Sequence, residues 1–370
     1  MKFTAKKEVL VKELGKIQGV GERRQTMMIL SNALISAENG KVSFLTTNME
    51  TGIRTSFDAD VIEKGKTTAN ARNLYEMIKR INSDIIEFDT DDTNLKITGG
   101  KAEAKIPTIP ASDFPKINIP ESKNAASLET SKLINMLDRV IFCSSTDETK
   151  YNLNSIYLDN GSNKGWLRAV STDGHRLGIS EQPVCTLEDI GLTKGILLPR
   201  KGASELRKIM ELSQSVNIMY DGGYLYMYSN DTTVFVKEME LDYPDYTRVI
   251  PSKNERTFRV KKDDMLSALD FVSLVSNIKS KTVAVSLSQG SLVLSSRSPE
   301  SGETVQEIEV DYDKDQIEIR FNSRYLMDIL SSSKDEILVF EVGDPLSPVL
   351  IKPDKVEDQE NLYVVMPMRL

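Results

Sequence analysis

The feature that most constrains the fold of this chain is an internal repeat that occurs three times. Each copy starts with a β-type segment, at Phe3, Leu128 and Phe258, so successive starts are 125 and 130 residues apart. A lysine-bearing helix with apolar residues at helical spacing follows each start. We expect these helices over residues 8–17, 133–141 and 263–272. A repeat of this length predicts three similar structural units.

Two further signals recur in the same order after each of these helices. A pair ending in glycine predicts a tight hairpin turn in every copy, at Asn39-Gly40, Asn160-Gly161 and Gln289-Gly290. A second helix is expected next, over residues 71–80, 203–210 and 323–330. Two more strands follow each second helix, and agreement in both order and spacing makes chance repetition improbable.

The junctions between the copies also match. Asp113-Phe-Pro precedes a prolyl, polar segment at 119–124, and Asp242-Tyr-Pro precedes a similar one at 250–254. We therefore predict an α+β protein of three domains, each with two helices packed on antiparallel sheet. The expected domains are residues 1–124, 125–251 and 252–370.

Composition excludes several classes of protein. The two cysteines, Cys143 and Cys185, form no CxxC pair, and His175 is the single histidine, so zinc sites and histidine-rich catalytic centres are not expected. We predict no metal and no cofactor. No apolar run approaches the length of a membrane span, and the charged start lacks the apolar stretch of a signal peptide. The expected location is the cytoplasm.

The positive charge is concentrated in the expected helices. Counted with their flanking residues, over 5–17, 71–81, 130–141, 200–212, 261–272 and 322–332, the six helices carry a net charge of +6. The whole chain carries −8, so the remainder carries −14. Basic helices in an acidic protein indicate one surface that meets a polyanion. The alternative is that lysine and arginine, as good helix formers, lie on solvated faces. Few aromatic residues accompany the basic ones, which favours contact with duplex phosphates over base stacking.

One segment superficially resembles a catalytic site. Ser171-Thr-Asp-Gly-His-Arg-Leu177 contains a serine, an aspartate and a histidine. A catalytic triad needs three groups that converge in space, and neighbours in sequence rarely do so; the chain also has no GxSxG motif. A turn at Asp173-Gly174 is the simpler interpretation. We predict no enzyme and no catalytic residue.

Taken together, the repeats, junctions and short sequence segments of this chain resemble those of the bacterial DNA sliding clamps, the β subunits of the replicative DNA polymerase holoenzyme. The resemblance rests on the three repeats, the two junctions, residues 171–177, Leu198-Pro-Arg-Lys-Gly202 and the ending Tyr363-Val-Val-Met-Pro-Met-Arg-Leu370. It covers the whole chain. One departure lies at Gln25–Met28, where family members commonly carry a Pro-x-x-Pro-like segment.

The resemblance implies a head-to-tail homodimer that closes into a ring of six domains around duplex DNA. Its partners would be non-sequence-specific double-stranded DNA, the replicative polymerase, the clamp loader, and other polymerases and repair proteins. The residues expected to face DNA in the pore are Arg24, Lys79, Arg80, Lys150, Tyr151, Arg200, Lys201 and Lys208.

The resemblance also implies an apolar pocket that captures short peptides carrying a glutamine and leucine or phenylalanine anchors. Its expected lining is Leu153, Thr172, Gly174, His175, Arg176, Leu177, Pro244, Val249, Val364, Val365, Met366, Pro367, Met368 and Arg369. Without the resemblance, residues 366–368 would be interpreted as a terminal strand packed in the core of the third domain.

A second interpretation from a different functional class remains open. The protein could be an oligomeric, peptide-binding scaffold that does not encircle DNA, with its basic helices simply solvated. Retention on DNA with blocked ends distinguishes the two hypotheses, because only a ring depends on the ends.

Overall fold

The computed structural model describes residues 1–370 apart from 21–26, 92, 253, 277–279, 356–359 and 370. These residues form two compact units, each described here by itself. The N-terminal unit comprises Met1–Ser131, Glu188–Thr193 and Lys201–Glu238. The C-terminal unit comprises Lys132–Leu187, Lys194–Arg200 and Met239–Leu370.

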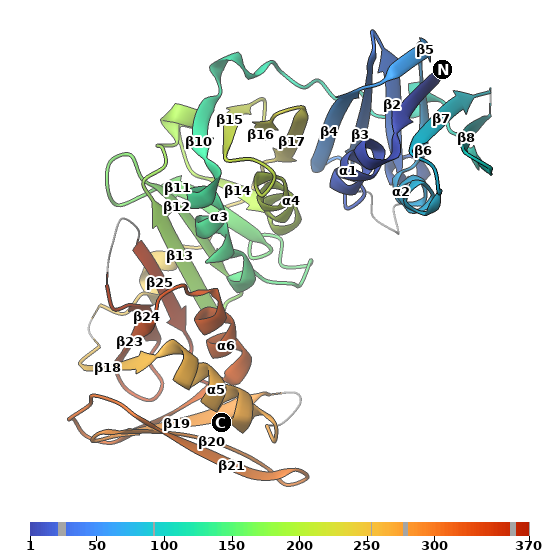
Figure 1. The fold of residues 1–370 in the computed structure, drawn as a ribbon. Coiled ribbons are helices and arrows are strands. Elements are labelled where there is room, and N and C mark those ends of the chain that lie inside the picture. Colours follow the sequence, from blue (N-terminus) through green and yellow to red (C-terminus); the bar gives the residue numbers. More distant parts are fainter. Residues whose placement is uncertain (21–26, 92, 253, 277–279, 356–359, 370) are drawn as a thin grey trace. The chain divides into compact units, whose positions relative to one another are not determined.

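Within the described residues, the N-terminal unit contains two antiparallel sheets (Figure 1). The larger has eight strands, in the order β10-β15-β16-β17-β4-β3-β2-β6. Those strands are β10 (Ala126–Glu129), β15 (Ser215–Asp221), β16 (Tyr224–Ser229), β17 (Thr232–Lys237), β4 (Thr51–Asp58), β3 (Lys41–Thr47), β2 (Asn32–Glu38) and β6 (Gly65–Asn70). The smaller has the order β5-β1-β7-β8-β9, with β5 (Asp60–Glu63), β1 (Lys2–Lys6), β7 (Ile85–Thr90), β8 (Asn94–Gly99) and β9 (Ala102–Pro107).

The described part of the C-terminal unit repeats this plan. Its eight-stranded sheet has the order β14-β11-β12-β13-β25-β24-β23-β18. Those strands are β14 (Ile196–Pro199), β11 (Ser155–Asn160), β12 (Leu167–Thr172), β13 (Arg176–Gln182), β25 (Glu360–Val365), β24 (Val349–Pro353), β23 (Ile337–Val342) and β18 (Arg256–Lys261). A four-stranded sheet has the order β21-β20-β19-β22, with β21 (Gly302–Glu309), β20 (Ser291–Ser298), β19 (Thr282–Ser288) and β22 (Ile317–Asn322).

Both eight-stranded sheets are assembled from two four-stranded halves that belong to successive repeats. Val234 of β17 pairs with Ile53 of β4, which joins the second repeat to the first. Ile179 of β13 pairs with Leu362 of β25, which joins the second repeat to the third. The repeat in the sequence is therefore a repeat in strand pairing.

The expected helices are present, with ends that differ by a few residues. They are α1 (Lys7–Ile17), α2 (Ala71–Arg80), α3 (Thr130–Asp138), α4 (Arg200–Met210), α5 (Lys262–Ser273) and α6 (Ser323–Ser332). Helix α1 packs beside α2, and α5 beside α6 (Figure 1). The side chain of Asn70 caps α2 by accepting a hydrogen bond from the backbone N–H of Asn73. Asn322 caps α6 in the same way through the N–H of Arg324.

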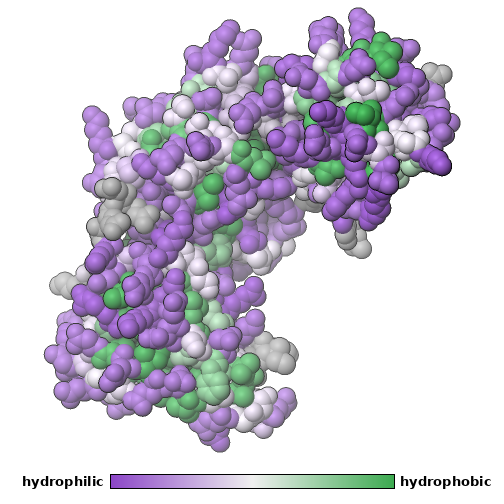
Figure 2. Space-filling model, viewed as in Figure 1, coloured by the Kyte–Doolittle hydropathy of each residue, from purple (hydrophilic) through white to green (hydrophobic). Residues whose placement is uncertain are grey.

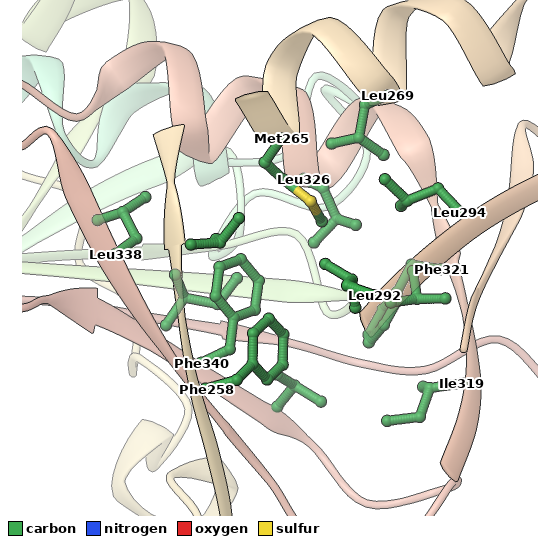
Figure 3. Packing of buried hydrophobic residues seen from close by; sticks show 14 of the residues in the cluster. Phe258, Met265, Leu269, Leu292, Leu294, Ile319, Phe321, Leu326, Leu338 and Phe340 are labelled. Atoms are coloured by element: carbon green, nitrogen blue, oxygen red, sulfur yellow. The ribbon is translucent and has the colours of Figure 1, made fainter. Parts of the chain in front are cut away.

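The core of the C-terminal unit lies between its helices and sheets (Figure 3). Phe258 of β18 stacks on Phe340 of β23 with ring centroids 4.9 Å apart, and Met265 and Leu269 of α5 project toward the same cluster. In the N-terminal unit, Phe3 stacks on Phe88 at 4.5 Å. Burial of each such side chain contributes roughly 1.5–3 kcal/mol to stability.

Two of the three expected hairpin turns are tight. Asn39 and Gly40 both have positive φ angles, 52° and 73°, and join β2 to β3 directly. Gly290 has φ 72° between β19 and β20. The expectation for Asn160-Gly161 is wrong: β11 continues through Asn160, and the connection to β12 is longer, closed by the N–H of Gly161 donating to the carbonyl of Trp166. Gly165, rather than Gly161, has the positive φ angle in this loop.

Candidate functional site

The segment from Ser171 to Leu177 is the end of one strand, a turn and the start of the next. Strand β12 ends at Thr172 and β13 begins at Arg176. Gly174 has φ 90°, a conformation that favours glycine. The Asp173 carboxylate accepts hydrogen bonds from the backbone N–H groups of His175 and Arg176, at 2.9 and 3.0 Å. The turn predicted at Asp173-Gly174 is confirmed.

The Arg176 side chain is buried beneath this turn. Its guanidinium donates hydrogen bonds to Asp173 at 3.1 Å, to Asp328 of α6 at 2.7 Å and to the carbonyl of Phe142 at 2.6 Å. It also lies over two aromatic rings, 5.3 Å from the centroid of Phe142 and 4.6 Å from that of Tyr325. Arg176 therefore links the turn to helix α6 through its contacts with Asp173 and Asp328.

Strand pairing brings the two ends of the expected pocket together. Leu177 of β13 lies opposite Val364 of β25, and Arg176 lies opposite Val365. The N–H of Met366 donates to the carbonyl of His175 at 2.9 Å, so the contact continues past the end of β25. Residues almost 190 positions apart in the chain thus form one surface.

A small apolar cluster lies on one face of these paired strands. Its buried members are Val170, Leu177, Ile179, Leu350 and Val364, and the partly buried residues packed against it are Tyr157, Tyr243, Tyr246, Ile250 and Leu362. We call these ten residues the β13–β25 cluster. The side chain of Val365, the next residue along β25, points to the opposite face of the sheet and belongs to the core of the C-terminal unit. It cannot line a pocket on this face.

The remaining expected pocket residues differ in exposure. Gly174, His175, Pro244, Val249 and Arg369 are exposed, whereas Leu153, Thr172, Met366, Pro367 and Met368 are half-buried. Met368 is held toward β19 and β22, because its N–H donates to the carbonyl of Arg320 and its sulfur lies 3.5 Å from the hydroxyl of Thr282. The alternative interpretation of residues 366–368 as a core strand is wrong, since β25 ends at Val365.

Sequence reasoning missed the aromatic part of the cluster. Tyr157 stacks on Tyr243 with centroids 5.1 Å apart, and Tyr246 completes the group at 6.4 Å from Tyr157. The hydroxyl of Tyr246 accepts a hydrogen bond from Arg168 at 3.0 Å. Burial raises the pKa of Tyr243, so this residue stays neutral and contributes an apolar ring. In the sequence, Tyr243 and Tyr246 lie on either side of Pro244 in the second junction. Two tyrosines so close to an expected pocket residue could have indicated an aromatic part of the pocket.

The basic residues expected to face DNA are distributed over both units. Lys79 and Arg80 are exposed at the end of α2, where Lys79 lies 5.6 Å from the ring centroid of Tyr75 and Arg80 pairs with Glu76. Lys201 is exposed at the start of α4. Lys208 lies on the same helix, 3.5 Å from the Glu205 carboxylate.

Three further residues expected to contact DNA lie in the C-terminal unit. Lys150 and Tyr151 are exposed in the loop before β11, and Arg200 is half-buried. Arg24 lies outside the described residues. Lys79, Arg80, Lys201 and Lys208 therefore belong to one unit, on helices α2 and α4.

The residues of the apparent triad have other roles. Ser171 is buried and its hydroxyl donates to the carbonyl of Val140. His175 stacks on Tyr325 with centroids 6.2 Å apart.

Among the described residues, no group of three or more histidine, cysteine, aspartate or glutamate side chains could hold a metal ion. In the same part of the chain, no helix has the length and apolar character needed to cross a membrane.

Comparison with known families and proteins places these features in context. Three family models of the DNA polymerase III beta subunit match: the N-terminal domain at residues 1–119, the central domain at 127–245 and the C-terminal domain at 247–369. The beta sliding clamp of Caulobacter vibrioides is 35% identical over 376 residues, and that of Pseudomonas aeruginosa 31% over 377, with all of both chains covered.

Solved structures agree with the sequence relatives. The DNA polymerase sliding clamp from Caulobacter crescentus superposes with a TM-score of 0.91 at 34% identity. A sliding clamp from Bartonella birtlesii, solved bound to griselimycin, gives 0.93 at 32% identity. Both comparisons cover the whole of each chain.

Proposed function

Because this chain belongs to the DNA polymerase III beta subunit family, the bacterial sliding clamps, we propose that it forms a closed ring on duplex DNA and tethers the replicative polymerase. Full-length similarity to sliding clamps, with all three family domains in order, is the observation that carries this proposal. The proposed domains are residues 1–124, 125–251 and 252–370. The proposed role is non-enzymatic and cytoplasmic.

Unpaired strand edges support a head-to-tail homodimer. At each internal junction the last strand of one half-sheet pairs with an edge strand of the next repeat, as in β4 with β17 and β13 with β25. The equivalent strands left at the two ends of the series are β9 and β21. Each lies at an edge of its sheet within the described residues. We propose that β9 of one copy pairs with β21 of the other, so that two such junctions close the ring.

Exposed apolar residues lie near the β21 edge. Phe271 and Leu274, in and just after α5, are 45% and 74% exposed, and Val305 of β21 is 54% exposed. Helix α5 packs against β21. Figure 2 shows hydrophobic residues on the surface over α5 and β19–β21. A partner copy would cover these side chains, as expected of an obligate interface.

The proposed mechanism is topological. A closed ring stays on an unbroken duplex without gripping it, so its phosphate contacts can be weak and non-specific. Binding through such contacts loses about 0.9 log unit of affinity per log unit of salt for each phosphate neutralised, and it permits sliding. The proposed contacts are Arg24, Lys79, Arg80, Lys150, Tyr151, Arg200, Lys201 and Lys208. Exposed positions on α2 and α4 support this assignment.

The β13–β25 cluster is the proposed docking site for partner peptides from the polymerase, the clamp loader, and other polymerases and repair proteins. The proposed lining is the set expected from sequence, without Val365 and with Tyr157, Tyr243 and Tyr246 added. Two leucine or phenylalanine anchors would contribute about 1.5–3 kcal/mol each. After ordering costs, an affinity near micromolar, about −8 kcal/mol, would allow partners to exchange.

Retention on DNA of different topology tests the proposal. The protein should be loaded by a clamp loader on nicked circular DNA and then passed through a sizing column at high salt. A ring stays on the circle and leaves after the circle is linearised; blocking the linear ends restores retention. A peptide-binding scaffold without encirclement would leave the circle as fast as the linear DNA, and that result would refute the proposal.

A further inference from the structure

A second concave surface belongs to the eight-stranded sheet of the N-terminal unit. We propose that this surface is a docking site for an extended, acidic peptide segment of a partner protein. It is a trough of about 460 Å³. We call it the serine trough, because Ser36, Ser43 and Ser56 form its floor.

Strand register explains why the surface is hollow. Ser36 of β2 lies opposite Ser43 of β3, and Ser43 lies opposite Ser56 of β4, so three short side chains form one row across three strands. The next residues along β2 and β3, Ile35 and Phe44, alternate to the helix-covered face and are fully buried. The serines therefore face away from the core.

Apolar side chains border the serine row on two sides. Leu34 and Leu45 form the adjacent cross-strand pair. Ile117 and Ile119, from the segment that leaves the first repeat, line the trough as well. A ligand in the trough would therefore meet apolar walls and a floor of hydroxyl groups.

Two cations lie on either side of the floor. Lys66 of β6 is opposite Ser36, and Arg54 of β4 is in the row beside Ser56. Both are exposed, and among the described residues neither makes an ion pair. Three interstrand spacings of about 4.8 Å and an offset of two residues along the strands separate Lys66 from Arg54, so their Cα atoms are about 16 Å apart.

The charge at one end of the trough limits which anion fits. Glu38 lies opposite Lys41, and Lys41 lies 4.0 Å from Asp58, so these three residues give this end a net charge of −1. A nucleic acid strand crossing the trough would place phosphates near Glu38 and Asp58. No aromatic residue lines the trough, so bases would have no stacking surface.

A peptide with separated carboxylates matches the arrangement better. An extended chain rises about 3.3 Å per residue, so the Cα separation of Lys66 and Arg54 corresponds to about five residues. The proposed ligand carries two acidic residues at about that spacing and an apolar residue between them, which would contact the Ile117 and Ile119 wall. Because the cations are exposed, binding should weaken steeply with salt.

Fluorescence anisotropy on the full-length protein tests the inference. The probes are labelled glutamate–leucine peptides whose two glutamates have varied spacing, each matched to a peptide with lysines in place of the glutamates. We expect the acidic peptide of about five-residue spacing to bind best. Lys66→Glu should weaken that binding by about tenfold, whereas Lys64→Glu, outside the trough, makes the same charge change and should leave it unaltered.

A filling variant supplies the second measurement. Ser43→Tyr places a bulky side chain on the floor while keeping a residue that strands favour, so it should abolish binding without unfolding the sheet. The inference is overturned if acidic and basic peptides bind alike, or if Lys64→Glu and Lys66→Glu weaken binding equally. Displacement of the peptide by oligothymidylate or inorganic phosphate at equal concentration would show a general anion site instead. Retention on circular DNA is a separate readout that none of these variants should change.

Discussion

The guanidinium of Arg176 donates a 2.7 Å hydrogen bond to the carboxylate of Asp328, two residues 152 positions apart in the chain. This bond connects the β12–β13 turn, where the proposed peptide site begins, to helix α6. Asp173 supplies a second carboxylate from the turn itself. The shape of the docking surface therefore depends on a contact between two repeats.

Replacing Asp328 with asparagine should weaken both the fold and the peptide site. The change keeps the size of the side chain but removes the charge that faces a buried guanidinium, which costs about 1–3 kcal/mol. Thermal unfolding and titration with a glutamine–leucine peptide measure the two effects. Arg324→Ala is the control, because Arg324 lies 3.9 Å from the same carboxylate and is largely exposed. Equal losses in the two variants would contradict the role assigned to the Arg176–Asp328 pair.

Tyr363 should make stability fall in strongly alkaline solution. Burial raises its pKa to about 12, from an ordinary value of 10. Between these values the unfolded chain loses the tyrosine proton while the folded chain keeps it, so the free energy of unfolding falls as pH rises from about 10 to 12. The contribution, present below pH 10, is on the order of 2 kcal/mol.

Tyr363→Phe isolates this effect. The phenylalanine keeps the buried ring but cannot ionise. It loses the contact between the Tyr363 hydroxyl and Ser332, at 3.2 Å, and the interaction of that hydroxyl with Arg139. Urea unfolding of both proteins at several pH values should show the variant slightly less stable near neutrality, by about 1 kcal/mol, with a flatter decline above pH 10. Parallel pH curves for the two proteins would argue against a buried, neutral Tyr363.

Local features were predictable from sequence because they depend on neighbouring residues. The helices follow from apolar spacing, and Asn39-Gly40 specifies its turn through two positive φ angles. The same rule failed at Asn160-Gly161, where Trp166 accepts the closing hydrogen bond from five residues further on. Glycine permits a turn but does not determine the length of a loop.

Long-range pairing was not predictable in the same way. Nothing near Leu177 specifies Val364 as its partner, or brings Tyr157 against Tyr243, because register is set by the packing of the whole sheet. The pocket residues came from family resemblance alone. The resemblance placed both Val364 and Val365 in the pocket. Strand alternation, however, puts their side chains on opposite faces of the sheet.

The proposed homodimer should come apart when charge is introduced beside β21. Phe271→Asp combined with Leu274→Asp puts two carboxylates where a partner would exclude water, and neither side chain is buried within the chain. The species measured by light scattering should shift from about twice 41.5 kDa to 41.5 kDa. Ile62→Asp combined with Ile85→Asp, at two exposed positions outside β9 and β21, makes the same charge change and is the control. A wild-type protein that is already monomeric would refute the ring.

Charge reversal on the basic helices should reduce the amount of protein loaded on DNA without disrupting the dimer. Lys79→Glu, Lys201→Glu and Lys208→Glu together change the charge by −6 on α2 and α4 of the N-terminal unit. If these lysines face the DNA phosphates, each one removed makes the slope of log affinity against log salt concentration shallower by about 0.9. The amount of protein loaded on circular DNA should then drop by at least about tenfold. The dimer should persist, because none of the three residues lies on β9 or β21. A matched triple variant at Lys64, Lys116 and Lys164, which are exposed outside the helices and do not adjoin β9 or β21 in sequence, makes the same charge change. If the two triple variants lose loading to the same extent, net charge rather than the helix surface controls DNA contact, and the assignment of the pore residues is wrong.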